Sequence, residues 1–363
     1  MYTCNSKAGA SADRVGKGGN VKTGYVLLPA KFVAALGAVS LALPSSAGLA
    51  ASRADIEGVK PSELLKLPFS PPISTDLAYD MTITKSEPGK KPSATKVKQL
   101  LRFEREANGY TLVIKFLQVS KDGITLDLRS EASRKRLPVQ LRPFFAPVAL
   151  DVAQDGTLVR VQEWPKIQRA IEDIPNMMAA MEKPENRESA RAIGRQSIKR
   201  FLSLTPEQAP ELMLKGWPSV FGFGGTELEN GAEYQEDTET PAALLPISIP
   251  GTKRFSLSRE SSGAGLHYHL VNEPDSQKSG AAISRYLLGM SEGLDALGRS
   301  NLEKAADLVR GMSIRDQLDI TFDPGTGLTE LATIERRVTI ANAGEAEERI
   351  DIRRSRSPVP ADN

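Results

Sequence analysis

The chain of 363 residues has one cysteine, Cys4, and two histidines. A single cysteine excludes a disulfide framework within the chain and a cysteine-based zinc site. The sequence also lacks a Gly-x-Ser-x-Gly nucleophile elbow. Its glycine-rich stretch, residues 221–226, does not lie between a strand and a helix, as phosphate-binding loops do. These absences argue against enzymes with a cysteine-bound zinc ion, serine hydrolases with a nucleophile elbow, and enzymes with a glycine-rich phosphate-binding loop.

Residues 1–50 have the layout of a secretory signal peptide. Lys31 precedes an apolar run at 32–43, and small residues then offer cleavage after Ala47 or after Ala50. The run is shorter than the ~20 residues that a membrane-spanning helix needs. We therefore predict a periplasmic or secreted protein with no transmembrane segment after cleavage. The alternative is an uncleaved tethering helix that begins near residue 25.

Removal of this leader would leave the chain nearly neutral. Five of the 47 basic residues and one of the 45 acidic residues precede residue 48, so the remainder carries about −2 instead of +2. A nearly neutral chain has no excess of positive charge with which to bind the phosphates of a nucleic acid, so we expect no nucleic-acid partner. The mature chain would have no cysteine, which suits an oxidising compartment.

The segment 76–161 predicts a meander of antiparallel strands. Its strand-like stretches alternate apolar and polar residues, and they are separated by the turn pairs Asn108-Gly109, Asp122-Gly123 and Asp155-Gly156. A short helix is expected before it, around residues 61–67.

Helical patterns cover 165–216 and 280–312, and strand patterns return at 226–271 and 313–354. Repeated short β-α-β units are absent from this pattern. We therefore predict an α+β fold: a large curved antiparallel sheet, or two, similar to a half-barrel, with helices packed on one face in the order β-α-β-α-β. We expect one domain over 51–354, with halves at about 60–216 and 226–354, and a loose tail at 355–363.

Both histidines lie in the strand-like stretch Gly265 to Leu270. His267 and His269 share one face of that strand because side chains alternate along it. With Glu273 just beyond, they suggest a zinc or iron site, and hence a metal-assisted periplasmic hydrolase. Most such pairs are simply polar residues on a half-exposed strand, and no further histidine is available as a ligand.

Aromatic residues near prolines and glycines are candidates for an apolar binding surface. Two lie in the Pro-rich connection at 143–147, one directly precedes Pro165, and three lie in the irregular segment that follows the helical region 165–216. The alternative is that they fill the core beneath the sheet. The candidate binding residues are Phe144, Phe145, Trp164, Trp217, Phe221 and Phe223.

These observations favour a non-enzymatic exported binding or envelope-associated protein that holds an apolar or lipid-like ligand in a groove of the curved sheet. No group stands out as tuned for catalysis, and no cofactor is expected. In layout only, the pattern is similar to open half-barrel carriers of lipids and lipoproteins in bacterial periplasms, and no motif supports that similarity. A scaffold for another envelope protein is an alternative that the sequence does not separate from a carrier.

Overall fold

The computed structural model describes residues 52–53, 63–137, 139–184, 187–241, 248–260, 265–289, 296–340 and 344–355. The predicted leader at 1–50 and most of the predicted tail lie outside these residues, so both stay predictions. Within the described part of the chain, no helix is both long enough and apolar enough to span a membrane.

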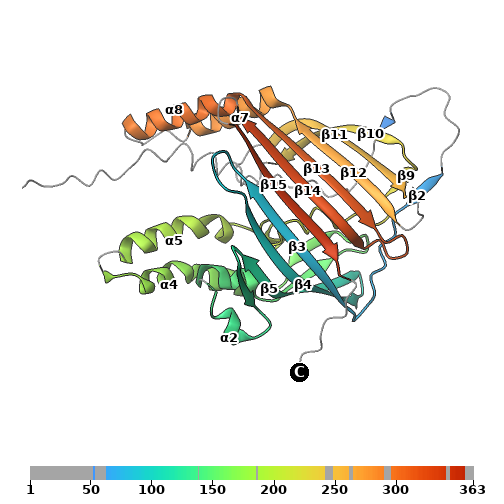
Figure 1. The fold of residues 1–363 in the computed structure, drawn as a ribbon, viewed down its shortest axis with the longest axis horizontal. Coiled ribbons are helices and arrows are strands. Elements are labelled where there is room, and N and C mark those ends of the chain that lie inside the picture. Colours follow the sequence, from blue (N-terminus) through green and yellow to red (C-terminus); the bar gives the residue numbers. More distant parts are fainter. Residues whose placement is uncertain are drawn as a thin grey trace, which may run out of the picture.

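Strands form the largest share of the described chain (Figure 1). They are β1 (Ser52–Arg53), β2 (Leu64–Lys66), β3 (Asp76–Ser86), β4 (Ser93–Glu106), β5 (Gly109–Lys121), β6 (Ile124–Asp127), β7 (Val148–Val152), β8 (Leu158–Val161), β9 (Glu227–Glu229), β10 (Glu233–Pro241), β11 (Ser248–Arg259), β12 (Leu266–Pro274), β13 (Met312–Phe322), β14 (Thr329–Ile340) and β15 (Gly344–Arg354).

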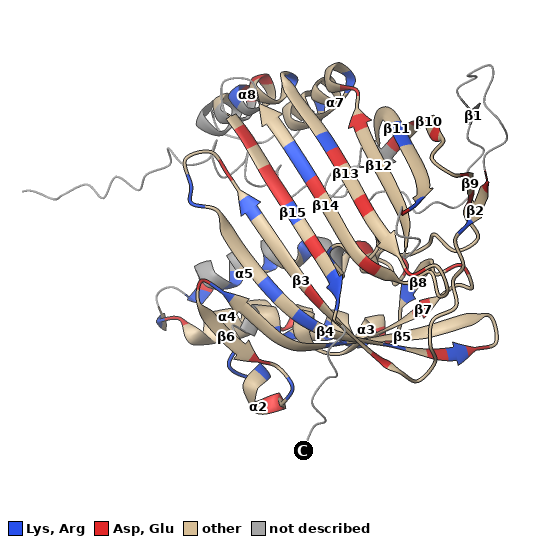
Figure 2. Ribbon diagram, turned by 45° about the vertical axis from the view of Figure 1, so that its right-hand side comes forward, with Lys and Arg blue, Asp and Glu red and all other residues tan. Residues whose placement is uncertain are grey.

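The helices are fewer and fall into two main groups. They are α2 (Glu131–Arg134), the 3-10 helix η2 (Val139–Phe145), α3 (Trp164–Glu172), α4 (Ile174–Met181), α5 (Arg187–Leu202), α6 (Ala209–Met213), α7 (Ser276–Gly289) and α8 (Ala296–Arg310). In Figure 2, α4 and α5 lie partly behind β3 and β4, and α7 and α8 lie along the top edge of the sheet.

One antiparallel sheet of 13 strands organises the molecule. Its order is β1-β10-β11-β12-β13-β14-β15-β3-β4-β5-β7-β8, and β6 pairs with β5. The sheet is curved and open, with β1 and β8 at the two ends of this path (Figure 1). Strands β2 and β9 form a separate two-stranded sheet. A large antiparallel sheet with helices, as predicted, is confirmed.

Two finer predictions are wrong. The expected helix around 61–67 is instead strand β2, because Leu65 pairs with Leu228 of β9 and both side chains are buried. The order β-α-β-α-β is not observed either, since α2 and η2 interrupt the first series of strands between β6 and β7. The sequence there, SEASR, supplies a Ser130 cap for the Ser133 amide, which favours a short helical turn.

The turn pairs in the sequence connect strands as predicted. Asn108-Gly109 joins β4 to β5, and Asp122-Gly123 joins β5 to β6. Asp122 and Gly123 both have positive φ angles, of 51° and 79°. At Gly109 a Cβ atom would lie 2.1 Å from the carbonyl oxygen of Val152, so only glycine fits there.

The two faces of the sheet differ sharply. We call the face that carries Tyr79, Leu318 and Phe255 the inner face, since all three side chains are buried in the core. The outer face carries the alternate residues, among them His267 and Asp319. The period of two along each strand sets this division. The helices and the β2–β9 pair contribute the rest of the core, for example Leu65, Ile171 and Ile198.

Candidate functional site

Seven polar side chains form a row across the inner face, which we call the inner polar row. Each is the direct register partner of the next on the neighbouring strand, from β10 to β3. In order they are Glu236, Lys253, Asn272, Asp316, Arg336, Glu348 and Lys85. Apolar rows flank it, so these charges lie in a surface that is otherwise hydrophobic.

Ion pairs satisfy most of this row. Lys253, with its side chain only 4% exposed, donates to Glu236 at 2.8 Å. The guanidinium of Arg336 donates to both carboxylate oxygens of Asp316, at 2.6 and 3.1 Å. Paired geometry of this kind is what allows charges to be buried. Asn272 is the exception: it is buried, and neither its amide nitrogen nor its oxygen has a hydrogen-bond partner among the described residues.

At the β3 end of the row, two lysines share one carboxylate. Lys85 lies 3.2 Å from Oε1 of Glu348, and Lys215 donates to the same oxygen. Gly216 places Lys215 there: its φ is +85°, and a Cβ atom on it would lie 3.2 Å from Ile350. Glycine at 216 thus lets the chain approach the sheet closely enough for the neighbouring lysine to reach Glu348. We call Lys85, Lys215 and Glu348 the two-lysine end.

Burial and charge act against each other at this end. Burial alone would raise the pKa of Glu348, but the ammonium groups of Lys215 and Lys85 outweigh it, so the pKa lies below its ordinary value. For Lys215, desolvation lowers the pKa, helped by the positive charge of Lys85 and opposed by Glu348. The lysine therefore lies in a partly dehydrated position beside a second positive charge.

A partly exposed apolar surface approaches the two-lysine end from β5 and the first helical group. Phe145 packs edge-on against Phe116 with ring centroids 5.2 Å apart, and Phe144 lies 4.8 Å from Phe201 of α5. All members are intermediate in exposure, neither buried nor fully exposed. We call this set the inner apolar strip: Ile83, Phe116, Val119, Phe144, Phe145, Met177, Met178 and Phe201.

Strand register shows that the strip leads toward the lysines. Phe116 and Tyr79 lie in the same row across the sheet, because both are register partners of Gln99 on β4. Val119 and Met81 likewise lie in one row, because both are register partners of Val97. Because side chains two residues apart share a face, the inner positions of β3 then continue through Ile83 to Lys85. Apolar side chains thus line the inner face up to the point where the charge begins.

Four of the predicted binding residues lie in the core or pack against it. Trp217 and Phe221 stack at 5.5 Å, and the Trp217 indole donates to Gln99 at 2.7 Å. The Trp164 indole donates to the Leu204 carbonyl at 2.9 Å. Phe223 packs against Tyr268, with ring centroids 4.8 Å apart.

The other two predicted residues, Phe144 and Phe145, belong to the inner apolar strip. Sequence reasoning did not find Lys85, Lys215 or Glu348. One signal was available for Glu348: this charged residue occupies a strand position of the same parity as Ile350 and Ile352, which both face inward.

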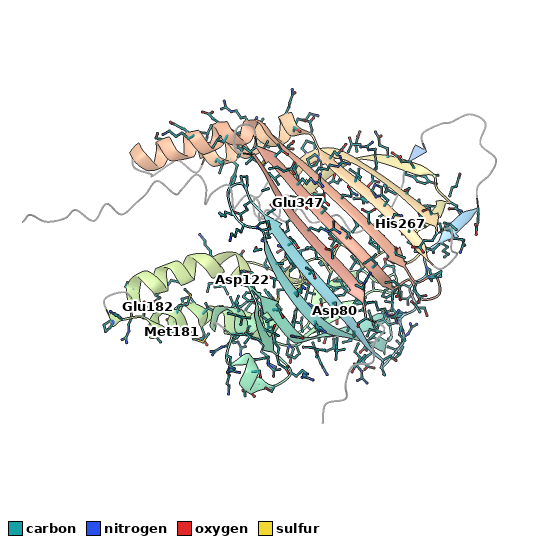
Figure 3. The ribbon with its side chains drawn as sticks, viewed as in Figure 1. Asp80, Asp122, Met181, Glu182, His267 and Glu347 are labelled. Carbon is teal, nitrogen blue, oxygen red and sulfur yellow. The ribbon has the colours of Figure 1, made fainter. Side chains whose placement is uncertain are left out.

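The histidine pair lies on the outer face of β12 (Figure 3). Asp319 of β13 is opposite His269, with 2.7 Å between His269 Nδ1 and Asp319 Oδ1, and His267 Nε2 is 3.6 Å from the same oxygen. Glu273, the third predicted ligand, pairs instead with Arg254 and Arg315. Within the described ranges, no group of three or more His, Cys, Asp or Glu side chains is arranged to hold a metal ion. The metal site stays a prediction.

Two pockets on the sheet include charged side chains. One of about 310 Å³ lies over β3, β4 and β5 and includes Lys96 and Lys98. Another of about 550 Å³ lies between β10, β11 and the start of α7, where Asp237, Glu239 and Asp275 contribute carboxylates. Neither pocket is the aliphatic cavity that we would expect in a lipid carrier.

Comparison with known proteins gives no family. No protein-family model and no curated protein matches the chain. A solved structure of lipovitellin, described by its lipid–protein interactions, aligns with a TM-score of 0.39 at 8% identity over 80% of this chain and 26% of that one. The alignment thus spans about a quarter of the lipovitellin chain. A porin-like protein from Bacteroides uniformis ATCC 8492 gives a TM-score of 0.16 at 8% identity, over 79% of this chain and 99% of that one. Similarities this low support no argument about function.

Proposed function

We propose that this chain is an exported, non-enzymatic binding protein that holds the apolar chain of a lipid-like amphiphile against the inner apolar strip. One observation carries the proposal: aromatic and methionine side chains gather, partly exposed, on the inner face between β5, η2, α4 and α5. The signal-peptide pattern of residues 1–50 supports the exported location, periplasmic or secreted.

The chemistry of the strip suits a flexible apolar ligand. Met177 and Met178 have unbranched, polarisable side chains that adapt to irregular shapes. Phe116 and Phe145 supply flat apolar area with few rotatable bonds. A ligand that covered roughly 200 Å² of this surface would gain about 5 kcal/mol from burial, before the cost of its immobilisation.

The packing of α4 and α5 keeps the strip in place. A Cβ atom on Gly194 of α5 would lie 2.8 Å from Pro175 of α4, so the two helices are in close contact at this point. Helix α4 also contacts η2, which carries Phe144 and Phe145. The strip is therefore held by three elements that touch one another and by the sheet itself.

A neutral fluorescent probe tests this proposal without involving charge. We expect N-phenyl-1-naphthylamine to bind the full chain saturably, with a rise in emission as it leaves water. Phe145→Ser should weaken that binding at least tenfold. Leu331→Ser is the matched control, since Leu331 is an exposed apolar residue on the outer face, 41% accessible.

Circular dichroism of each variant confirms that the fold is retained. Absence of saturable binding to the wild-type chain would overturn the proposal. So would an equal loss of affinity in the Leu331→Ser control, because the probe would then bind exposed apolar side chains without selection.

A further inference from the structure

Resting on the function proposed above, we infer that the ligand is an anionic amphiphile whose phosphate or carboxylate headgroup is bound by Lys85 and Lys215. The inference concerns the two-lysine end of the inner polar row, and it names the class of ligand that the apolar strip alone does not specify.

Charge balance along the row is the first argument. Lys253 pairs with Glu236, and Arg336 pairs with Asp316, so each of these cations has a carboxylate of its own. At the two-lysine end, by contrast, Glu348 is the one described carboxylate that pairs with either Lys85 or Lys215. Two cations share one anion there, so the end carries one positive charge in excess.

Exposure is the second argument. The side chains of Lys253 and Asp316 are 4% and 3% exposed, so an incoming group cannot reach them. Those of Lys85 and Lys215 are 44% and 34% exposed. The excess charge thus lies at the accessible end of the row. Partial burial also makes an anion there interact more strongly than it would in bulk water.

Distance is the third argument. Along β3, Lys85 is six residues beyond Tyr79, whose row contains Phe116. Six residues of strand span about 20 Å. One leaflet of a bilayer core is about 15 Å thick, which is the approximate length of an acyl chain in a lipid. An acyl chain lying from the phenylalanines past Val119 and Ile83 would therefore place its headgroup within reach of the flexible lysine side chains.

The competing explanation is that Glu348 and the lysines form a purely structural ion pair. The two explanations differ in the effect of removing the carboxylate. If the pair is only structural, Glu348→Gln weakens packing and does not improve binding of any ligand. If the lysines bind an anionic headgroup, the same substitution removes a competitor for them and raises affinity for an anionic ligand.

Competition against N-phenyl-1-naphthylamine on the full chain separates these outcomes. We expect dodecyl phosphate to displace the probe at a concentration at least tenfold lower than 1-dodecanol does, in a buffer without phosphate. Lys215→Met and Lys85→Met should reduce this preference about tenfold when combined. Glu348→Gln should increase it, and Lys96→Met, which removes an exposed lysine of the outer face, should leave it unchanged.

Each contrary result has a distinct meaning. Equal displacement by dodecanol and dodecyl phosphate overturns the headgroup assignment and leaves the proposed apolar site standing. Failure of the probe itself to bind removes the proposed function instead. Displacement by inorganic phosphate at the same concentration as by dodecyl phosphate would also overturn the inference, since the site would then recognise a free anion and not an amphiphile. A loss of preference in Glu348→Gln would support the structural ion pair and reject the headgroup site.

Discussion

The inner polar row and the outer-face group of His267, His269 and Asp319 are built in the same way but lie in different surroundings. Both place ionisable side chains opposite one another on adjacent antiparallel strands. Asp316 and Asp319 belong to the same strand, β13, only three residues apart. Asp316 faces inward with a side chain 3% exposed, while Asp319 faces outward with one that is 30% exposed.

The comparison shows that burial, more than pairing geometry, decides what a cross-strand charge does. An exposed pair is solvated whether or not its partner is present, so its partner matters little. A buried charge depends on its partner, because removal of that partner leaves an uncompensated charge in a poorly solvated position. The neighbouring aspartates of β13 are therefore an internal test of this difference.

The largest effect is expected from Asp316→Ala. This change leaves the guanidinium of Arg336, 14% exposed, without the carboxylate that it chelates. We expect the free energy of unfolding to fall by about 3–5 kcal/mol, measured by urea denaturation. The matched change Asp319→Ala on the outer face should cost less than about 1 kcal/mol. Similar losses for both variants would refute the role assigned to burial.

A smaller effect of opposite sign is expected at Asn272. Its buried amide has no partner among the described residues, so it loses hydration without gaining a hydrogen bond. Asn272→Leu, of similar volume, should raise the free energy of unfolding by about 1–2 kcal/mol in the same denaturation assay. A decrease would instead show that the amide is satisfied in solution and contributes to stability.

The third prediction concerns pH at the two-lysine end. Glu348 has a pKa below its ordinary value of 4.5 in the folded chain, so its ionised form stabilises the fold above that pH. As the pH falls through the lower, folded-state pKa, that contribution is lost. The stability difference between wild type and Glu348→Gln should therefore shrink between about pH 5 and pH 3, as followed by denaturation at several pH values. A difference that stays constant over this range would contradict the assignment.

Local sequence patterns predicted much of the sheet. The Asn-Gly and Asp-Gly pairs identify hairpins because their backbone angles are accessible to few other residues, as Asp122 and Gly123 illustrate. A helix was wrongly predicted around 61–67 because a three-residue strand such as β2 is too short to show a period. It forms only because β9, more than 160 residues away, pairs with it.

The candidate site was less predictable, for a physical reason. Glu348 and Lys85 are direct neighbours in the sheet although 263 residues separate them in the chain, and no local pattern encodes that register. Phe144 and Phe145 were found as candidates because paired aromatics between prolines are conspicuous. Trp217 was grouped with them because it lies beside a proline in an irregular, glycine-rich segment, yet its indole donates to Gln99 inside the core.

The pairing of β15 with β3 also has a consequence for folding. The strands β3–β8 and β10–β14 are each joined mostly by short connections, so either set can assemble early from nearby contacts. The two sets become one sheet only when residues 344–354 dock beside residues 76–86, which is the slowest kind of contact to form. Until residues 344–354 have been synthesised, one edge of β3 has no strand to pair with. A chaperone could bind such an edge until the last strand has been made.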